Sequence, residues 1–152
     1  MSNRNVMAHV TFCDDIRHEN TGKLILIGCY RYVLMTPSLP ATFPMCMALS
    51  IVAPREPHIA SLTIKVLIGD QTIVESAPGS DQMQAIYRDA VDPPDTGVAL
   101  EPLTCLDFVM KLEAITLDKP TTLRVMVIAD GQEFEAGRLH MLPGTNAVGA
   151  ST

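Results

Sequence analysis

Apolar and polar side chains alternate along most of this chain with a period of two residues, and this pattern limits its fold more than any other feature. In residues 6–13, one side of the segment carries Val6, Ala8, Val10 and Phe12. Alternation of this kind is typical of a β-strand that buries one face. The same pattern predicts further strands at residues 23–34, 43–53, 60–68, 72–75, from about residue 100, at 123–129 and at 133–142.

The first two predicted strands differ in character. Asp14 and Asp15 follow residues 6–13 directly, and we expect them to end the first strand. A turn at residues 19–22 comes next, where Gly22 is free to adopt a positive φ. Residues 23–34 begin with apolar side chains on both faces, which is typical of a strand in the middle of a sheet. We therefore expect the second strand at the centre of a sheet.

Turn chemistry separates the remaining strands. Prolines interrupt the alternation within residues 36–40 and again after residue 53, because proline has no N–H group to donate to a neighbouring strand. The Gly-Asp-Gln segment at residues 69–71 predicts a tight hairpin turn. Asp130-Gly131 lies between two alternating segments and predicts a second hairpin.

Residues 81–91 have helical spacing instead. One helical face would carry Met83, Ile86, Tyr87 and Val91. Ser80 is placed to cap the first turn, and Pro93-Pro94 prevents continuation. We therefore expect one short helix at residues 81–91.

These elements predict an all-β fold, an antiparallel β-sandwich of the immunoglobulin-like or C2-like kind with seven to eight strands. Strands do not alternate with helices, which argues against a doubly wound α/β fold. The length of 152 residues suits one domain. We expect residues 1–142 to form that domain and residues 143–152, which are small and polar, to form a flexible C-terminal tail.

The composition excludes several classes of protein. A hydrophobic content of 47% with only 18% charged residues excludes intrinsic disorder, and a net charge of −6 argues against a nucleic-acid binder. The sequence contains no apolar run of the roughly 18 residues that a transmembrane helix needs, and no apolar stretch typical of a secretory signal follows the first residues. The four cysteines lie far apart without Cys-x-x-Cys spacing. We therefore expect a cytoplasmic protein with reduced cysteines.

Two short segments and the closing hairpin carry a family resemblance. Residues 13–17 read Cys-Asp-Asp-Ile-Arg, and residues 22–30 read Gly-Lys-Leu-Ile-Leu-Ile-Gly-Cys-Tyr. Together with residues 123–142, in which Ala136-Gly137 precedes the last part of the final strand, they resemble a family of small uncharacterised bacterial proteins, a domain of unknown function. The resemblance implies a small β-sandwich and no known activity.

Carboxylates gather near the end of the first strand and recur in other predicted loops. The aspartates concerned are Asp14, Asp15, Asp70, Asp92 and Asp95. Calcium binds several carboxylate oxygens, so these residues are candidate ligands in a calcium-linked, C2-like surface binder. The spacing of a calcium-binding loop is missing, however. Solvated turns, with Arg17 paired to a neighbour, are the favoured interpretation.

Cys13 and His18 are the candidates for a cysteine-dependent enzyme. A nucleophilic cysteine needs an exposed position and a neighbouring positive charge that lowers its pKa. Cys13 instead adjoins two carboxylates and falls within a strand, so a structural cysteine is favoured. The chain also has no Gly-x-Ser-x-Gly motif and no glycine-rich phosphate loop. We therefore expect no enzymatic activity, no catalytic residue and no cofactor.

The remaining function class is binding. An open sandwich has exposed sheet edges, and residues 43–53 and 72–75 are the candidate edge strands for adding a strand from another chain. The nine methionines are expected mainly to fill the core. We predict a non-catalytic module that binds a protein partner or a second copy of itself, and the acidic charge favours a basic partner.

Overall fold

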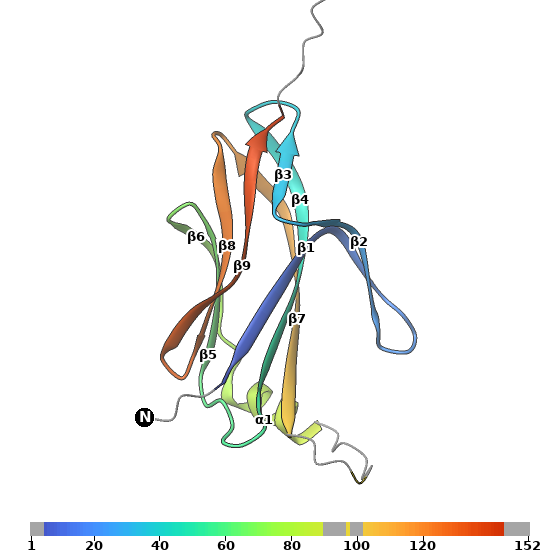
Figure 1. Cartoon of the computed structure of the whole chain (residues 1–152), viewed down its shortest axis with the longest axis vertical. Coiled ribbons are helices and arrows are strands. Elements are labelled where there is room, and N and C mark those ends of the chain that lie inside the picture. Colours follow the sequence, from blue (N-terminus) through green and yellow to red (C-terminus); the bar gives the residue numbers. More distant parts are fainter. Residues whose placement is uncertain (1–4, 90–96, 98–101, 145–152) are drawn as a thin grey trace, which may run out of the picture.

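The structure is a computed structural model that describes residues 5–89, 97 and 102–144, and these residues form two β-sheets packed together with one short helix (Figure 1). The four-stranded sheet has the order β2-β1-β4-β7. Its members are β1 (Met7–His18), β2 (Leu24–Tyr30), β4 (Ala41–Pro54) and β7 (Leu103–Leu117). The five-stranded sheet has the order β3-β9-β8-β5-β6. Its members are β3 (Val33–Thr36), β9 (Gln132–Pro143), β8 (Thr121–Ala129), β5 (Leu62–Ile68) and β6 (Gln71–Ser76). The predicted all-β sandwich is confirmed.

The core lies between the two sheets and contains the side chains that the alternation assigned to it. From β4, the buried residues include Met45, Met47, Leu49 and Ile51. The facing sheet contributes Ile64, Val66, Leu123, Val125, Val127 and Met141, among others. Four methionines, Met45, Met47, Met83 and Met141, are therefore core residues, whereas Met7 and Met35 are exposed. Both predicted hairpin turns are also present, with φ of 48° at Asp130 and 82° at Gly131 in the second.

The prediction for residues 23–34 is wrong. This segment is not one central strand, because β2 ends at Tyr30 and lies at the edge of its sheet. The chain then crosses to the other sheet, where β3 pairs in parallel with β9. The crossing divides the expected strand in two, so the described residues contain nine strands rather than seven or eight, and one strand pair is parallel.

The two expected edge strands have different outcomes. Residues 43–53 belong to β4, which pairs with β1 on one side and β7 on the other, so this edge prediction is wrong. Residues 72–75 belong to β6, which is an edge strand as predicted. The long apolar alternation of β4 therefore reflects burial in the middle of a sheet.

The helix α1 (Ser80–Asp89) starts where the sequence predicted, with Met83 and Tyr87 buried. The first-turn contact differs from the expected one, because the side-chain oxygen of Gln82 accepts the Gly79 N–H at 3.1 Å. In this kind of capping, a glutamine in the first turn reaches back and satisfies the N–H group of the residue before the helix. The tail was expected from residue 143, but Pro143 is the last residue of β9 and pairs with Thr36. Val91, Pro93-Pro94 and residues 145–152 lie outside the described residues.

Candidate functional site

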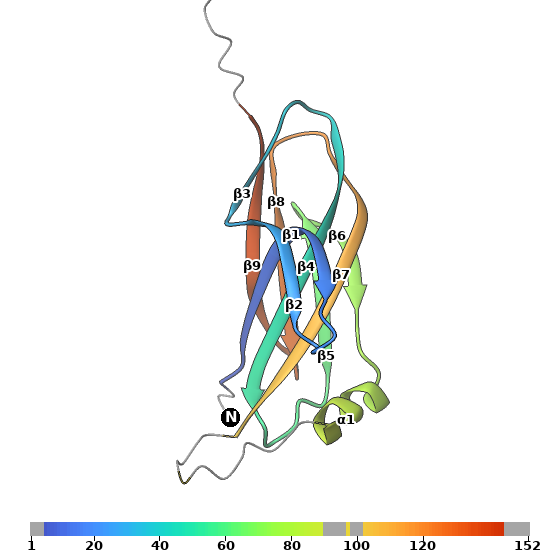
Figure 2. The same cartoon turned by 90° about the vertical axis from the view of Figure 1, so that its right-hand side faces the viewer.

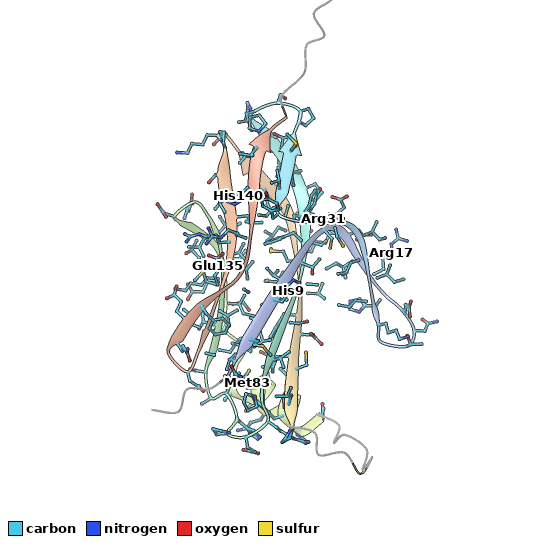
Figure 3. The ribbon with its side chains drawn as sticks, in the orientation of Figure 1. His9, Arg17, Arg31, Met83, Glu135 and His140 are labelled. Atoms are coloured by element: carbon cyan, nitrogen blue, oxygen red, sulfur yellow. The ribbon has the colours of Figure 1, made fainter. Side chains whose placement is uncertain are left out.

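A two-stranded arm projects from the four-stranded sheet (Figures 1 and 2). The first half of β1 pairs with β4 as far as Cys13, which lies opposite Cys46. The second half pairs with β2 alone, from Asp15 opposite Ile27 to His18 opposite Leu24. Asp14 and Asp15 therefore do not end the first strand, as the sequence suggested, because β2 continues to supply main-chain partners. Figure 3 shows Arg17 on this arm, away from the sandwich, and Arg31 at the bend where the arm meets it.

The outer strand of the arm exposes large aliphatic side chains. Leu24, Ile25 and Ile27 have exposed fractions of 37%, 42% and 41%. Because successive side chains of a strand point to opposite faces, Leu24 and Leu26 lie on one face of the arm and Ile25 and Ile27 on the other. No residue of β2 is charged. The strand thus presents apolar side chains on both faces and a main-chain edge that no other strand of the described residues pairs with.

The other three sheet edges carry features that discourage pairing with another chain. β7 has Asp107, Lys111 and Glu113, β6 has Glu75, and β3 is only four residues long. Charged side chains and short edge strands are common protections against edge-to-edge association. β2 lacks charges and proline, so it is the least protected of the four edges.

Three residues meet at the base of the arm. The hydroxyl of Tyr30 donates a hydrogen bond to the Asp14 carboxylate. Burial, reinforced by this hydrogen bond, raises the pKa of Tyr30 to about 12. Gly28 has a φ of +67°, and any Cβ at this position would overlap Asp14 Oδ2. Because Gly28 has no side chain, the Asp14 carboxylate can occupy the space beside it.

A cavity of about 430 Å³ adjoins this base. Asp14 and Tyr30 line one part of it, and the remaining lining residues are Leu34, Met35, Thr36, Pro37, Ala41, Thr42, Phe43 and Pro44. Thr36 is 4% exposed, and its hydroxyl oxygen has no hydrogen-bond partner within the described part of the chain. The cavity thus combines a largely apolar wall with the Asp14 carboxylate, and an apolar lining with few polar groups is typical of a small-molecule site.

The five candidate calcium ligands are not brought together where the structure describes them. Asp14 and Asp15 lie on β1, whereas Asp70 lies in the turn between β5 and β6 of the other sheet. Asp15 bonds to Arg17 at 3.2 Å, and the hydrogen bond from Arg17 lowers the pKa of Asp15. Asp92 and Asp95 lie outside the described residues. Within residues 5–89, 97 and 102–144, no three His, Cys, Asp or Glu side chains form a group suited to a metal ion.

The two residues of the hypothetical cysteine enzyme are also apart. Cys13 is fully buried, and burial raises the pKa of its thiol to about 11. Its thiol lies 3.7 Å from the Cys46 carbonyl oxygen. His18 is exposed five residues further along the same strand, which corresponds to roughly 16 Å along an extended chain. This arrangement suits a structural cysteine better than a nucleophile.

The geometry defines a class of protein, a two-sheet β-sandwich whose first sheet continues into a projecting arm. The chain belongs to the family of unknown function DUF6941, whose model matches residues 8–141. This match includes the arm, the cavity and both sheets. No curated protein and no solved structure matches the chain. Among the described residues, no helix has the length and apolar character needed to cross a membrane.

Proposed function

We propose that this protein is a non-catalytic interaction module that associates with a second copy of itself by pairing β2 with β2. The observation that carries the proposal is the exposure of Leu24, Ile25 and Ile27 on an uncharged edge strand. Strand addition at a sheet edge gives affinity through main-chain hydrogen bonds and specificity through the alternating side chains. β2 offers both of these contributions.

The arm has a physical reason to associate. An isolated two-stranded hairpin is at best marginally stable in water, and three or more strands with an apolar face are needed for independent stability. Beyond Cys13, the arm has two strands only. Pairing two arms would make a four-stranded sheet, in which aliphatic side chains of the two β2 strands become cross-strand neighbours on both faces.

A second copy is the occupant that best fits this strand. In a twofold interface the same patch contacts itself, so it must be complementary to itself. Antiparallel pairing of Leu24–Tyr30 with its own copy sets aliphatic side chains near aliphatic side chains and brings no charged residue of either strand into contact. A basic partner would instead be expected to meet acidic side chains, which β2 does not supply.

Sedimentation velocity from micromolar to millimolar concentration tests the proposal. The native chain is expected to reach twice its mass of 16.5 kDa as its concentration rises. Ile25→Lys and Ile27→Lys each place a charge on the face of the arm that these two residues share, and both variants are expected to keep the protein monomeric. Ile73→Lys is the matched control, because Ile73 is 37% exposed on β6, another edge strand. A native protein that stays monomeric throughout, or a dimer that only Ile73→Lys disrupts, would contradict the proposal.

A further inference from the structure

The cavity at the base of the arm carries a second inference, which does not rest on self-association. We propose that it binds a small amphipathic organic cation, with the ammonium group against the Asp14 carboxylate and the apolar body against Leu34, Met35 and Phe43. The charge of Asp14 and the size and apolar wall of the cavity support this proposal.

The charge at the mouth of the cavity is negative and is not balanced locally. The neighbouring Asp15 is paired with Arg17, and Asp70 in the other sheet lies 3.8 Å from Arg124. Asp14 has a neutral partner instead, the Tyr30 hydroxyl, and no Arg or Lys of the described residues forms an ion pair with it. A cationic group would form an ion pair with this carboxylate, whereas an anion would be repelled by it.

The size and wall of the cavity indicate the rest of the ligand. A volume of about 430 Å³ lies within the range of sites that hold small molecules. The wall is formed largely by aliphatic, aromatic and proline side chains, so the body of the ligand should be apolar. The aromatic rings of Tyr30 and Phe43 also suit an ammonium group, which is attracted to ring faces.

The test uses 2-phenylethylamine, which carries an ammonium group on a short apolar body, and 3-phenylpropionate, which has a similar body and a negative charge. Backbone NMR spectra of the native protein are titrated with each compound, and thermal unfolding is measured alongside, because a ligand that binds the native state raises the unfolding temperature. The amine is expected to shift the resonances of Asp14, Tyr30 and Thr36 and to raise the unfolding temperature. The propionate is expected to do neither.

Three variants separate the site from unspecific attraction to an acidic protein. Asp14→Asn is expected to weaken amine binding about tenfold or more, because it removes the charge and keeps the shape. Asp70→Asn, which makes the same change of charge at an exposed site in the other sheet, is expected to have no effect. Ile27→Lys is expected to bind the amine normally, so failure of self-association and failure of this site are distinguishable. Equal binding of amine and propionate, equal loss in Asp14→Asn and Asp70→Asn, or no binding of the amine would overturn the proposal.

Discussion

The carboxylate of Asp14 occupies the space into which a side chain on Gly28 would extend. The two residues face each other across the arm, between the paired residues Cys13 and Cys29 and the pair Asp15 and Ile27. Gly28 also has a φ of +67°, a conformation that other residues adopt at a cost. This relationship fixes the base of the arm and one part of the cavity.

Replacement of Gly28 by alanine is therefore expected to destabilise the protein for two reasons. The left-handed backbone costs roughly 1–2 kcal/mol for a residue with a Cβ, and the new methyl group displaces Asp14. Urea unfolding measures the sum of these two losses of stability. Gly22→Ala is the control, because Gly22 has a φ of +83° with nothing within 4 Å of its Cβ position, so it reports the backbone cost alone. An equal loss of stability in the two variants would show that Asp14 does not crowd Gly28.

Gly137 permits a close approach of the two sheets, and Gly137→Ala is expected to be destabilising. A Cβ at this position would lie 2.7 Å from Val10 Cγ1. Overpacking of this kind typically costs about 1–3 kcal/mol. Val10→Ala in the same chain makes room for the new methyl group, so the double variant should lose less stability than the sum of the two single variants. Additive losses in urea unfolding would contradict the contact.

Alkaline pH is expected to destabilise the protein through Cys13. Burial raises the pKa of this thiol to about 11, above its ordinary value of about 8.5. Between these two values the unfolded chain has lost a proton that the native protein still holds, so the free energy of unfolding falls as pH rises. Urea unfolding at a series of pH values measures this slope. Cys13→Ala should make the decline shallower, while an unchanged slope would show that the thiol does not titrate in this way.

Asp130 is expected to contribute to stability through two main-chain hydrogen bonds. Its Oδ1 accepts the N–H groups of Ala60 and Ser61, each at 2.8 Å, and so ties the β8–β9 hairpin to the entry of β5. Asp130→Ala should cost about 2–3 kcal/mol, because hydrogen bonds to charged groups are among the stronger ones. Asp130→Asn keeps an acceptor oxygen and should cost less.

The control for Asp130 is another turn aspartate. Asp70 lies in the β5–β6 hairpin turn and is fully exposed, 3.8 Å from Arg124. Exposed ion pairs contribute little, so Asp70→Ala should change the free energy of unfolding by less than about 1 kcal/mol. Equal losses in Asp70→Ala and Asp130→Ala would contradict the role assigned to Asp130.

The sandwich could be predicted from the sequence because each core strand shows its burial directly. The alternation in β4 and β8 identifies the inward residues, and Asp130-Gly131 identifies its hairpin. These signals are local, so they can be interpreted without knowing which strands are neighbours in the sheet. The parallel pairing of β3 with β9 joins distant segments, and no local pattern indicates it.

The arm was misinterpreted for a physical reason. Apolar side chains on both faces of β2 indicate that both faces are to be covered, but the pattern does not say by which chain. A strand in the centre of a sheet and an edge strand that pairs with another molecule both have apolar side chains on their two faces, so the sequence pattern is the same. The interruption by Gly28 and the break after Tyr30 were the available signals against a single central strand.

The cavity was missed because its polar groups come from separate strands. Asp14 lies on β1, Tyr30 on β2 and Thr36 on β3, and Phe43 lies on β4. Only the crossing of the chain from one sheet to the other brings them together. The spacing of these residues along the sequence therefore carries no sign of a shared site.

The central claim is that β2 of one copy pairs with β2 of another. An isotope-filtered NOE experiment on a mixture of labelled and unlabelled protein detects contacts between copies directly. We expect intermolecular NOEs among the methyl groups of Leu24, Ile25, Leu26 and Ile27, at concentrations where the protein sediments as a dimer. Intermolecular NOEs confined to another edge, such as Ile73 on β6, or none from β2 in a dimeric sample, would contradict the account.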